Sequence, residues 1–494
     1  MVLTTERLTI LLKEALVKLG KVVDVWEASE YVLALLSLKR LSDQFEEEQK
    51  EYKTKKAKEE RDNFSYFVPK EARWSKISES SGYKGETIDK ALYELEKANS
   101  ERLGGLFTPK KFTRPDLLTK EVLDEIISLY GSPDDSLTDS NLATPNVIGE
   151  AFENLIEEVA ESSGRAGGDF YTTKEVVKTL VMILDPQESL RISDPVCGSG
   201  GFLVKVVEYL ENKGQNRDNI SLFGQEVKEG TWRIARLNLL LHGIDVTELK
   251  RGNTMTTPIV DGGSLMKFDI VMGNPIWNQK GDGWGYTLFK DGDPYSRAQY
   301  GLATKNQGDW MWVQHMLATL EDDGRMGIVL DNGALFRGGQ EGKIRKKVIE
   351  NDLIEGIIAL PPNLFKGTGS PGCLIILNKK KPESLKEQIF FIHAENEHEE
   401  GKAQNYLRET HITKIVETYR NKTVIEKFSD LIEFKVIKEN DFNLNVSRYI
   451  DILPEEEQID LPCVWEQVES IQDHRTNLEQ QLVETMKELG VKKN

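Results

Sequence analysis

The segment Asn274-Pro275-Ile276-Trp277 follows Gly273 and the run Phe268 to Met272, whose composition predicts a buried strand. Because proline restricts its own backbone and that of its predecessor, the Asn274 amide oxygen and the Pro275 carbonyl form a fixed pair of acceptors. Such a pair can bind both N–H groups of an amine whose lone pair is delocalised into a ring, and can favour its pyramidal form as a sulfonium methyl group arrives. Trp277 offers a face on which a base taken out of a duplex can stack. An isolated Asn-Pro pair is usually only a turn, so this chemistry needs support elsewhere in the chain.

A glycine-rich segment, Asp194 to Gly201, lies between a short apolar run and the helical pattern Leu203 to Leu210. Glycines let the backbone approach a ligand closely at the start of a helix. The alternative for such a loop is an ordinary tight turn. We expect the loop to hold a nucleotide-like ligand through Asp194, Cys197, Gly198, Ser199 and Gly200.

The next predicted strand begins at Ile220 and ends in Glu226, and a helical pattern runs from Lys228 to Leu241. An acid at the tip of the second strand is where doubly wound folds bind ribose hydroxyls, so Glu226 is the ribose candidate. Asn253 stands at the end of a third predicted strand, where it would reach the adenine edge of the ligand. An Asn that follows a Gly is as often only a turn residue.

Upstream of these motifs, a further segment leads into a helix and ends in Thr172-Thr173-Lys174-Glu175. Thr172 and Glu175 have the spacing of a capping box, which predicts a helix start. The preceding Phe170 and Tyr171 could close over the ligand. We therefore include Phe170, Tyr171 and Thr172 in the predicted binding site.

The elements that must position these residues form an alternating pattern from residue 141 to residue 452. Short β-rich runs separated by helical segments predict a mostly parallel, doubly wound sheet of the Rossmann-like α/β class. Predicted strands include Ile192-Ser193, Met326 to Leu330, Ile354 to Leu360 and Cys373 to Leu377; beyond about Lys380 the chain is more charged and no strand is assigned. The Asn274-Pro275 motif would then lie at the carboxyl end of a strand, where the functional sites of parallel sheets are found.

Helical segments flank this predicted domain on both sides. Residues 1–140 form a helical N-terminal domain, with apolar residues at helical spacing from Leu8 to Phe45 and a break at Gly131 to Ser136. Residues 453–494 contain a final helix from Val464 to Leu489. Its apolar residues fall on a series of alternating four- and three-residue steps, in which Arg475 and Thr485 fill the two remaining places; they are Val464, Val468, Ile471, Leu478, Leu482 and Leu489. Such a stripe favours a partner helix, and the alternative is that it packs on its own domain.

The amino-acid composition argues against a membrane protein, a secreted protein and a zinc protein. A chain with 39% hydrophobic and 30% charged residues is typical of a soluble protein, and no run approaches the ~18 apolar residues of a membrane span. The amphipathic start, Met1 to Leu19, is unlike a signal peptide, so we expect a cytoplasmic protein without a membrane partner. Cys197, Cys373 and Cys463 lack the spacing of a zinc site, and no metal is expected.

The net charge of −18 argues against direct DNA binding, because phosphate contacts need Lys and Arg. A local basic cleft can coexist with an acidic exterior, or a partner subunit can supply most of the contacts. The second explanation implies that the isolated chain binds DNA poorly.

Together these segments resemble the N6-adenine DNA methyltransferases, and most closely the modification subunits of type I restriction-modification enzymes, over nearly the whole chain. The stretch Tyr31 to Phe45 resembles the helical N-terminal domain of that family, and Asn443 to Tyr449 resembles its C-terminal motif. Its downstream blocks are matched by Gly308 to Trp312, Gly324 to Leu330, Gly333 to Gly339, Ile344-Arg345 and Leu360 to Phe365.

The resemblance implies that the chain methylates adenine N6 in double-stranded DNA with S-adenosylmethionine, after the target base has flipped out. Asn274, Pro275 and Trp277 would be catalytic, and Asn274 would also border the cofactor. The family architecture implies a specificity subunit that reads the target sequence, two copies of this chain for each specificity subunit, and a restriction subunit with nuclease and translocase activity.

Two departures from the family leave alternatives open. The usual motif is Asn-Pro-Pro followed by Phe or Tyr, whereas Ile276 and Trp277 stand here, and the third-strand residue, often Asp, is Asn253. A cofactor-binding scaffold with weakened catalysis is therefore one alternative. Methylation of cytosine N4 uses the same geometry, although Asn rather than Ser at position 274 favours adenine. A protein glutamine methyltransferase would not need the long N- and C-terminal extensions.

Overall fold

A computed structural model describes residues 2–52, 60–107, 111–162, 172–244, 248–365, 368–402, 404–451 and 461–490. The chain divides into two compact units, Met1–Ile450 and Asp451–Asn494. Within these ranges, no helix is both long enough and apolar enough to cross a membrane.

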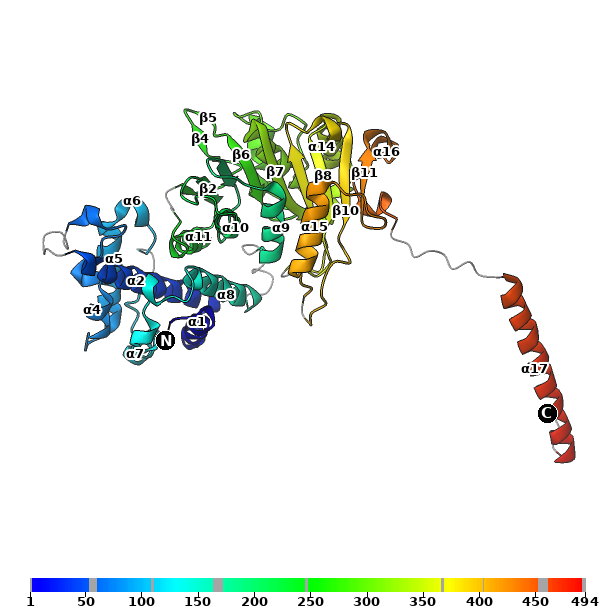
Figure 1. Cartoon of the computed structure of the whole chain (residues 1–494), viewed down its shortest axis with the longest axis horizontal. Helices are drawn as coiled ribbons and strands as arrows, with labels where there is room; N and C mark the ends of the chain where they lie inside the picture. The colour runs from blue at the N-terminus through cyan, green and yellow to red at the C-terminus, as the bar shows by residue number, and fades with distance from the viewer. Residues whose placement is uncertain are drawn as a thin grey trace. The chain divides into compact units, whose positions relative to one another are not determined.

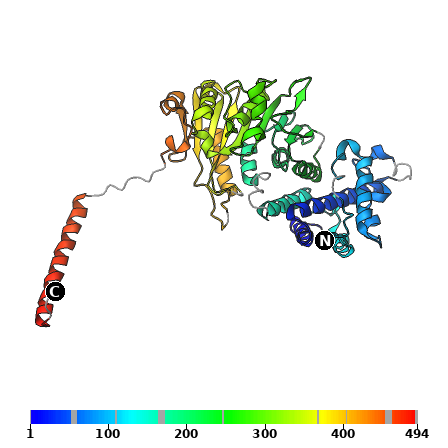
Figure 2. The same ribbon diagram turned by 180° about the vertical axis from the view of Figure 1, so that it is seen from behind.

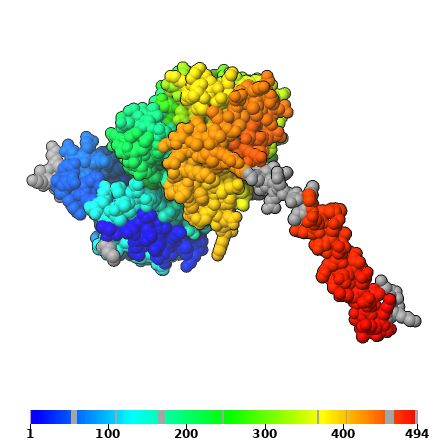
Figure 3. Space-filling model, turned by 45° about the vertical axis from the view of Figure 1, so that its right-hand side comes forward, coloured from blue at the N-terminus to red at the C-terminus, as the bar shows by residue number. Residues whose placement is uncertain are grey.

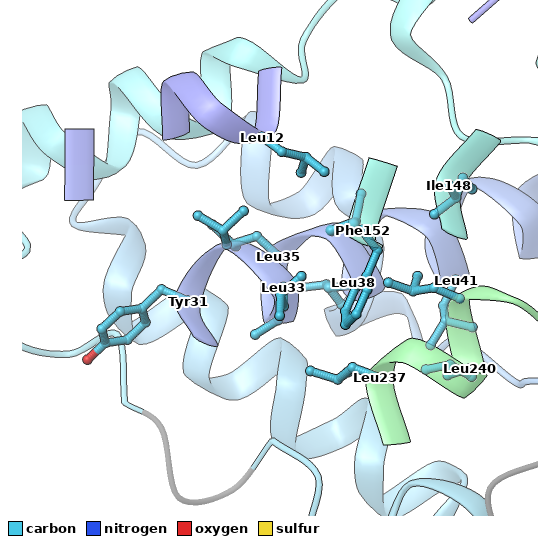
Figure 4. Packing of buried hydrophobic residues seen from close by; sticks show 14 of the residues in the cluster. Leu12, Tyr31, Leu33, Leu35, Leu38, Leu41, Ile148, Phe152, Leu237 and Leu240 are labelled. Carbon is cyan, nitrogen blue, oxygen red and sulfur yellow. The ribbon is translucent and has the colours of Figure 1, made fainter. Parts of the chain in front are cut away.

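The first unit begins with a helical region, as the N-terminal pattern predicts (Figures 1 and 2). Residues 28–39 of the long helix α2 are all buried, so this part of the helix lies on every side against other elements. Figure 4 shows Leu33 and Leu38 of α2 between Leu12 of α1, Phe152 of α8 and Leu237 of α11 (Glu229–Leu241). The helices are α1 (Thr5–Leu19), α2 (Val25–Glu51), α4 (Trp74–Ser78), α5 (Lys84–Ala98), α6 (Ser100–Leu103), α7 (Lys120–Leu129) and α8 (Val147–Ser162).

Helix α8 links the helical region to the sheet. It packs against α1, as the space-filling view shows (Figure 3), and also against α2 and α11 (Glu229–Leu241). The contact with α11 is close, because a methyl group on Gly149 would lie 2.1 Å from His242 Nε2. One core therefore runs from the N-terminal helices into the helices beside the sheet. The domain boundary near residue 140 remains a prediction.

A nine-stranded sheet forms the rest of the first unit, in the order β11-β10-β8-β9-β7-β6-β1-β2-β3. Neighbours are parallel, except that β9 is antiparallel to β7 and β8, and β11 is antiparallel to β10. The predicted mostly parallel sheet is confirmed. The strands are β1 (Arg191–Asp194), β2 (Ser221–Glu226), β3 (Leu249–Arg251), β6 (Phe268–Gly273), β7 (Leu320–Asp331), β8 (Ile354–Ala359), β9 (Gly372–Asn378), β10 (Gln388–His393) and β11 (Ser429–Glu433), with a separate hairpin of β4 (Val260–Asp261) and β5 (Ser264–Leu265).

Both faces of the sheet are covered, so the central strands β6, β8 and β9 are buried almost throughout and are nearly continuous apolar runs. Along β6, Ile270 and Met272 face one core and Val271 faces the other. Helices α9 (Lys174–Leu184), α10 (Gly201–Asn212) and α15 (Glu409–Asn421) cover the first face, and Figure 1 shows α9 and α15 in front of the strands. Helices α13 (Asp309–Ala318) and α14 (Gly339–Glu350) cover the second face. The short helices α12 (Tyr286–Gly292) and α16 (Phe434–Glu439) complete the unit.

Two strands, β10 and β11, lie in the segment to which the sequence assigned none. β10 is buried from Ile389 to His393 and pairs with β8 over Phe390 to His393. Charged residues surround it in the sequence, and they hide the short apolar run from a periodicity analysis. The second unit contains the predicted C-terminal helix, α17 (Leu461–Glu488).

Candidate active site

The glycine loop and the Asn-Pro motif meet at the carboxyl ends of two adjacent strands. From β1 the chain moves outward to β2 and β3, and then returns to β6 on the opposite side of β1. Such a reversal in an open α/β sheet leaves a crevice in which ligands bind. A pocket at this point is lined by residues of both motifs, namely Asp194, Val196, Cys197, Gly198, Ser199, Gly201 and Asn274.

Helix α8 lines the same pocket through Phe152, Glu153 and Ile156. The sequence analysis missed these residues, because nothing in a helical pattern indicates which sheet edge the helix will cover. Their contribution comes from the packing of α8 against α11.

The glycine loop has the backbone that its composition predicts. Gly198 and Gly200 have φ values of 53° and 84°, in the left-handed region that favours glycine. The Cys197 N–H donates to the Gln225 carbonyl at 3.0 Å, and the Asn238 side chain of α11 donates to the Ser199 carbonyl at 2.9 Å. The loop is therefore held between β2 and α11.

Asp194, the last residue of β1, is almost completely buried. Its Oδ1 accepts from the Val196 N–H at 3.0 Å, whereas its Oδ2 has no hydrogen-bond partner among the described residues. Burial raises the pKa of Asp194 to about 8. A buried acceptor without a protein donor fits a ligand that brings an N–H group into the pocket.

Glu226 and Asn253 lie at the ends of the next two strands, as predicted. Glu226 Oε1 accepts from the Lys228 N–H at 2.7 Å, and burial raises the pKa of this carboxyl. The Gly252 N–H donates to the Glu226 carbonyl at 3.0 Å, which brings the two strand ends together. The Asn253 side-chain oxygen accepts from the Met255 N–H at 2.9 Å, so Asn253 does form a turn; its contact with a cofactor remains a prediction.

The amide of Asn274 has a defined orientation in the pocket. Its Nδ2 donates to the Thr172 hydroxyl at 3.1 Å, and its Oδ1 accepts from the Trp277 indole N–H at 2.9 Å. Pro275 is buried, and Ile276 is 39% exposed. The Trp277 ring is half-buried and contacts Phe365 edge to face, with 4.8 Å between the ring centroids.

The predicted capping box at Thr172 is wrong. Helix α9 begins at Lys174, its N-cap residue is Thr173, and the Thr173 side chain makes no capping hydrogen bond. The Thr173 hydroxyl instead donates to the Leu364 carbonyl at 3.0 Å, and the Thr172 hydroxyl accepts from Asn274. Contacts with distant residues displace the local cap. Phe170 and Tyr171 lie outside the described residues.

A cluster of charged residues that the sequence analysis did not assign holds Asn278, just beyond the Asn274-Pro275-Ile276-Trp277 segment. Asn278, with φ of 54°, donates its backbone N–H to Asp309 at 2.8 Å and its side-chain N–H to Asp331 at 3.0 Å. Arg337 bridges Asp309 at 2.8 Å and Asp331 at 3.2 Å. Burial raises the pKa of Asp309 to about 7. Asp309 and Arg337 lie in two of the sequence blocks that resemble the family, and this resemblance was the signal from which their role could have been predicted.

Two family models match the chain. A model described as N-6 DNA Methylase matches residues 143–458, and one described as HsdM N-terminal domain matches residues 11–129. The chain is 36% identical to the type I restriction enzyme MjaVIII methylase subunit of Methanocaldococcus jannaschii, over 77% of this chain and 66% of that protein. It is 39% identical to the MjaVII methylase subunit of the same organism, over 71% of this chain and 60% of that protein. The chain thus spans less than two thirds of the length of these two relatives.

A solved structure shows the same fold over most of the chain. The crystal structure of the type I restriction-modification system methyltransferase subunit from Streptococcus thermophilus has a TM-score of 0.80 and 26% identity, and the match covers 91% of this chain and 100% of that one. The first family model spans well over half of the chain and includes the glycine loop, Glu226 and Asn274. The chain therefore belongs to the N-6 DNA methylase family, as a relative of the methylase subunits of type I restriction enzymes.

Proposed function

We propose that this chain transfers a methyl group from S-adenosylmethionine to adenine N6 in double-stranded DNA, as the modification subunit of a type I restriction-modification enzyme. The observation that carries the proposal is the pocket lined by both the glycine loop and Asn274. A methyl donor on the loop and an amine at Asn274 would share one crevice, which methyl transfer requires.

Groups at the carboxyl ends of β1 and β2 suit S-adenosylmethionine. Asp194, which lines the pocket, would accept a hydrogen bond from the amino-acid end through its Oδ2, and Glu226, which ends β2 outside the pocket lining, would accept hydrogen bonds from the ribose. When bound, the cofactor supplies a methyl group activated on a sulfonium. The proposed binding set is Phe170, Tyr171, Thr172, Asp194, Cys197, Gly198, Ser199, Gly200, Glu226, Asn253 and Asn274.

The catalytic residues act by holding the amine. The Asn274 amide oxygen and the Pro275 carbonyl accept its two N–H bonds, which favours the pyramidal nitrogen. Trp277 supplies aromatic surface for a base taken out of the duplex, and such extrusion costs a few kcal/mol. No strong general base is needed, since the amine loses its proton after methyl transfer.

The proposed assembly contains a specificity subunit, two copies of this chain and a restriction subunit, in the cytoplasm. A chain with a net charge of −18 repels DNA, so another subunit must contribute basic surface. Helix α17 is the proposed docking element, because its apolar residues are exposed.

Mass spectrometry of nucleosides tests the reaction. DNA is incubated with the assembled complex and S-adenosylmethionine carrying a labelled methyl group, and then digested. Labelled N6-methyladenosine is the expected product. Labelled N4-methylcytosine would make the chain a cytosine enzyme, and cofactor binding without any labelled base would make it a scaffold.

A further inference from the structure

Among the described residues, the Asn274 amide has one hydrogen-bond partner at its nitrogen and one at its oxygen, and the two partners differ chemically. The Thr172 hydroxyl, 3.1 Å from Nδ2, can donate or accept, and therefore tolerates either end of an amide. The Trp277 indole N–H, 2.9 Å from Oδ1, can only donate. Of these two neighbours, only Trp277 distinguishes the amide oxygen from the amide nitrogen.

The indole of Trp277 is held by the sheet. Its Nε1 also lies 3.3 Å from the Val329 carbonyl oxygen of β7, and its ring contacts Phe365 at an interplanar angle of 71°. A Cβ atom on Gly372 of β9 would lie 3.1 Å from this ring. The position of the indole N–H is therefore fixed. The intervening Ile276 is exposed, and it lacks the ring with which a proline at this position would stiffen the backbone.

We propose that Trp277 is a positioning residue whose indole N–H sets the orientation of the Asn274 amide. This inference rests on the proposed function. A carbonyl oxygen has two lone pairs, so Asn274 Oδ1 accepts from Trp277 with one and keeps the other for the target amine. In a reversed amide, Nδ2 would face the indole N–H and the amine, and both are donors. The indole thus preorganises the acceptor that the catalytic loop must present.

A double-mutant cycle in the assembled methyltransferase tests this role. Trp277→Phe keeps an aromatic ring but removes the N–H, and we expect it to lower kcat about tenfold, the effect of one lost hydrogen bond. The KM for DNA should change by less than about twofold, because the aromatic surface remains.

The second arm of the cycle uses Asn274→Asp, whose two carboxylate oxygens are both acceptors. Orientation no longer matters in that background, so Trp277→Phe should change kcat there by less than about twofold. The same tenfold loss of kcat with Asn274 and with Asn274→Asp would show that Trp277 only packs the loop. If Trp277→Phe leaves kcat unchanged in the chain that keeps Asn274, Trp277 has no positioning role.

Two further measurements keep the test decisive. Trp74→Phe is the matched control, because Trp74 is buried in α4 and its indole nitrogen has no hydrogen-bond partner among the described residues; it should leave kcat unchanged. If Asn274→Asp is inactive, NMR spectroscopy tests the contact between the two residues instead. The indole N–H resonance of Trp277 is identified by its loss in Trp277→Phe. That resonance should shift in Asn274→Ala, and an unshifted resonance would overturn the proposal. An inactive wild-type complex would instead refute the proposed function.

Discussion

At the scale of single residues, the proposed reaction depends most on the Asn274 amide. Asn274→Ala should lower the rate of methyl transfer about 10²-fold or more, since one preorganised dipole at a reacting group is worth this much. Cofactor affinity should stay within a few-fold, because Asn274 would only border the cofactor while its acceptor serves the target amine. Single-turnover kinetics and calorimetry measure the two effects. The control is Asn219→Ala, an exposed residue in the loop before β2. Full turnover by Asn274→Ala would show that the proposed mechanism is wrong.

The affinity for the cofactor should depend on pH through Asp194. Burial raises the pKa of Asp194 to about 8, above its usual value of 3.8. The protonated carboxyl therefore contributes to folding stability at low pH, and this contribution is lost as the pH rises from the usual pKa through the raised one. The carboxyl is mostly protonated at pH 7 in the ligand-free chain. A ligand N–H binds the carboxylate best, so cofactor affinity should rise from pH 6.5 to pH 8, with release of a proton.

Calorimetry in two buffers of different ionisation enthalpy measures this proton. Asp194→Asn should reduce the proton release and flatten the dependence of affinity on pH. Equal proton release by the wild type and Asp194→Asn would mean that another group titrates, and Asp194 would then lose its assignment to the amino-acid end of the cofactor.

At the scale of elements, the segment from Asn274 to Asn278 follows β6 directly, and its far end is attached to α13 and β7 through the hydrogen bonds of Asn278. Asp309 is the first residue of α13, Asp331 is the last residue of β7, and Arg337 lies between their carboxylates. Asn278 binds both acids, so the positions of α13 and β7 determine where the loop ends. Side chains from elements far apart in sequence therefore support Asn274 indirectly.

Removing the central charge of this cluster should be costly. Arg337→Ala leaves Asp309, which is fully buried, without its counter-charge, and should lower the free energy of unfolding by about 3 kcal/mol. Urea denaturation measures the change. The matched control is Arg408→Ala, which breaks an exposed ion pair with Glu399 and should cost below about 1 kcal/mol. Equal losses for the two variants would show that the cluster contributes no more than a surface pair.

At the scale of the whole molecule, the first unit buries its apolar residues in three cores, one among the N-terminal helices and one on each face of the sheet, whereas the second unit taken by itself leaves apolar residues uncovered. On α17, Ile471, Leu478 and Leu482 are 68%, 52% and 60% exposed. Exposed apolar residues in a heptad-like pattern are typical of a helix that binds a partner. The net charge of −18 gives the chain a second reason to need a subunit with basic surface.

Deleting the residues after Leu461 should leave cofactor binding by the isolated chain unchanged, because the pocket lies entirely in the first unit. The same deletion should abolish co-purification with the specificity subunit and sequence-specific methylation. Ile471→Glu with Leu478→Glu should have the same effect, and Gln472→Glu with Glu479→Gln, on neighbouring exposed positions, is the control. A truncated chain that still assembles and methylates would show that α17 is not the docking element.

The sequence alone determined the class of fold and the order of the motifs. Alternation of strands and helices is local, and so are the glycine loop, Glu226 and the Asn-Pro pair, because composition and spacing depend on neighbours along the chain. Only the tertiary structure decided which side chains share the pocket. Phe152 of α8 lines it through helix packing, and Thr172 binds Asn274 instead of capping α9. Contacts between distant residues depend on how elements pack, and no local pattern in the chain records that packing.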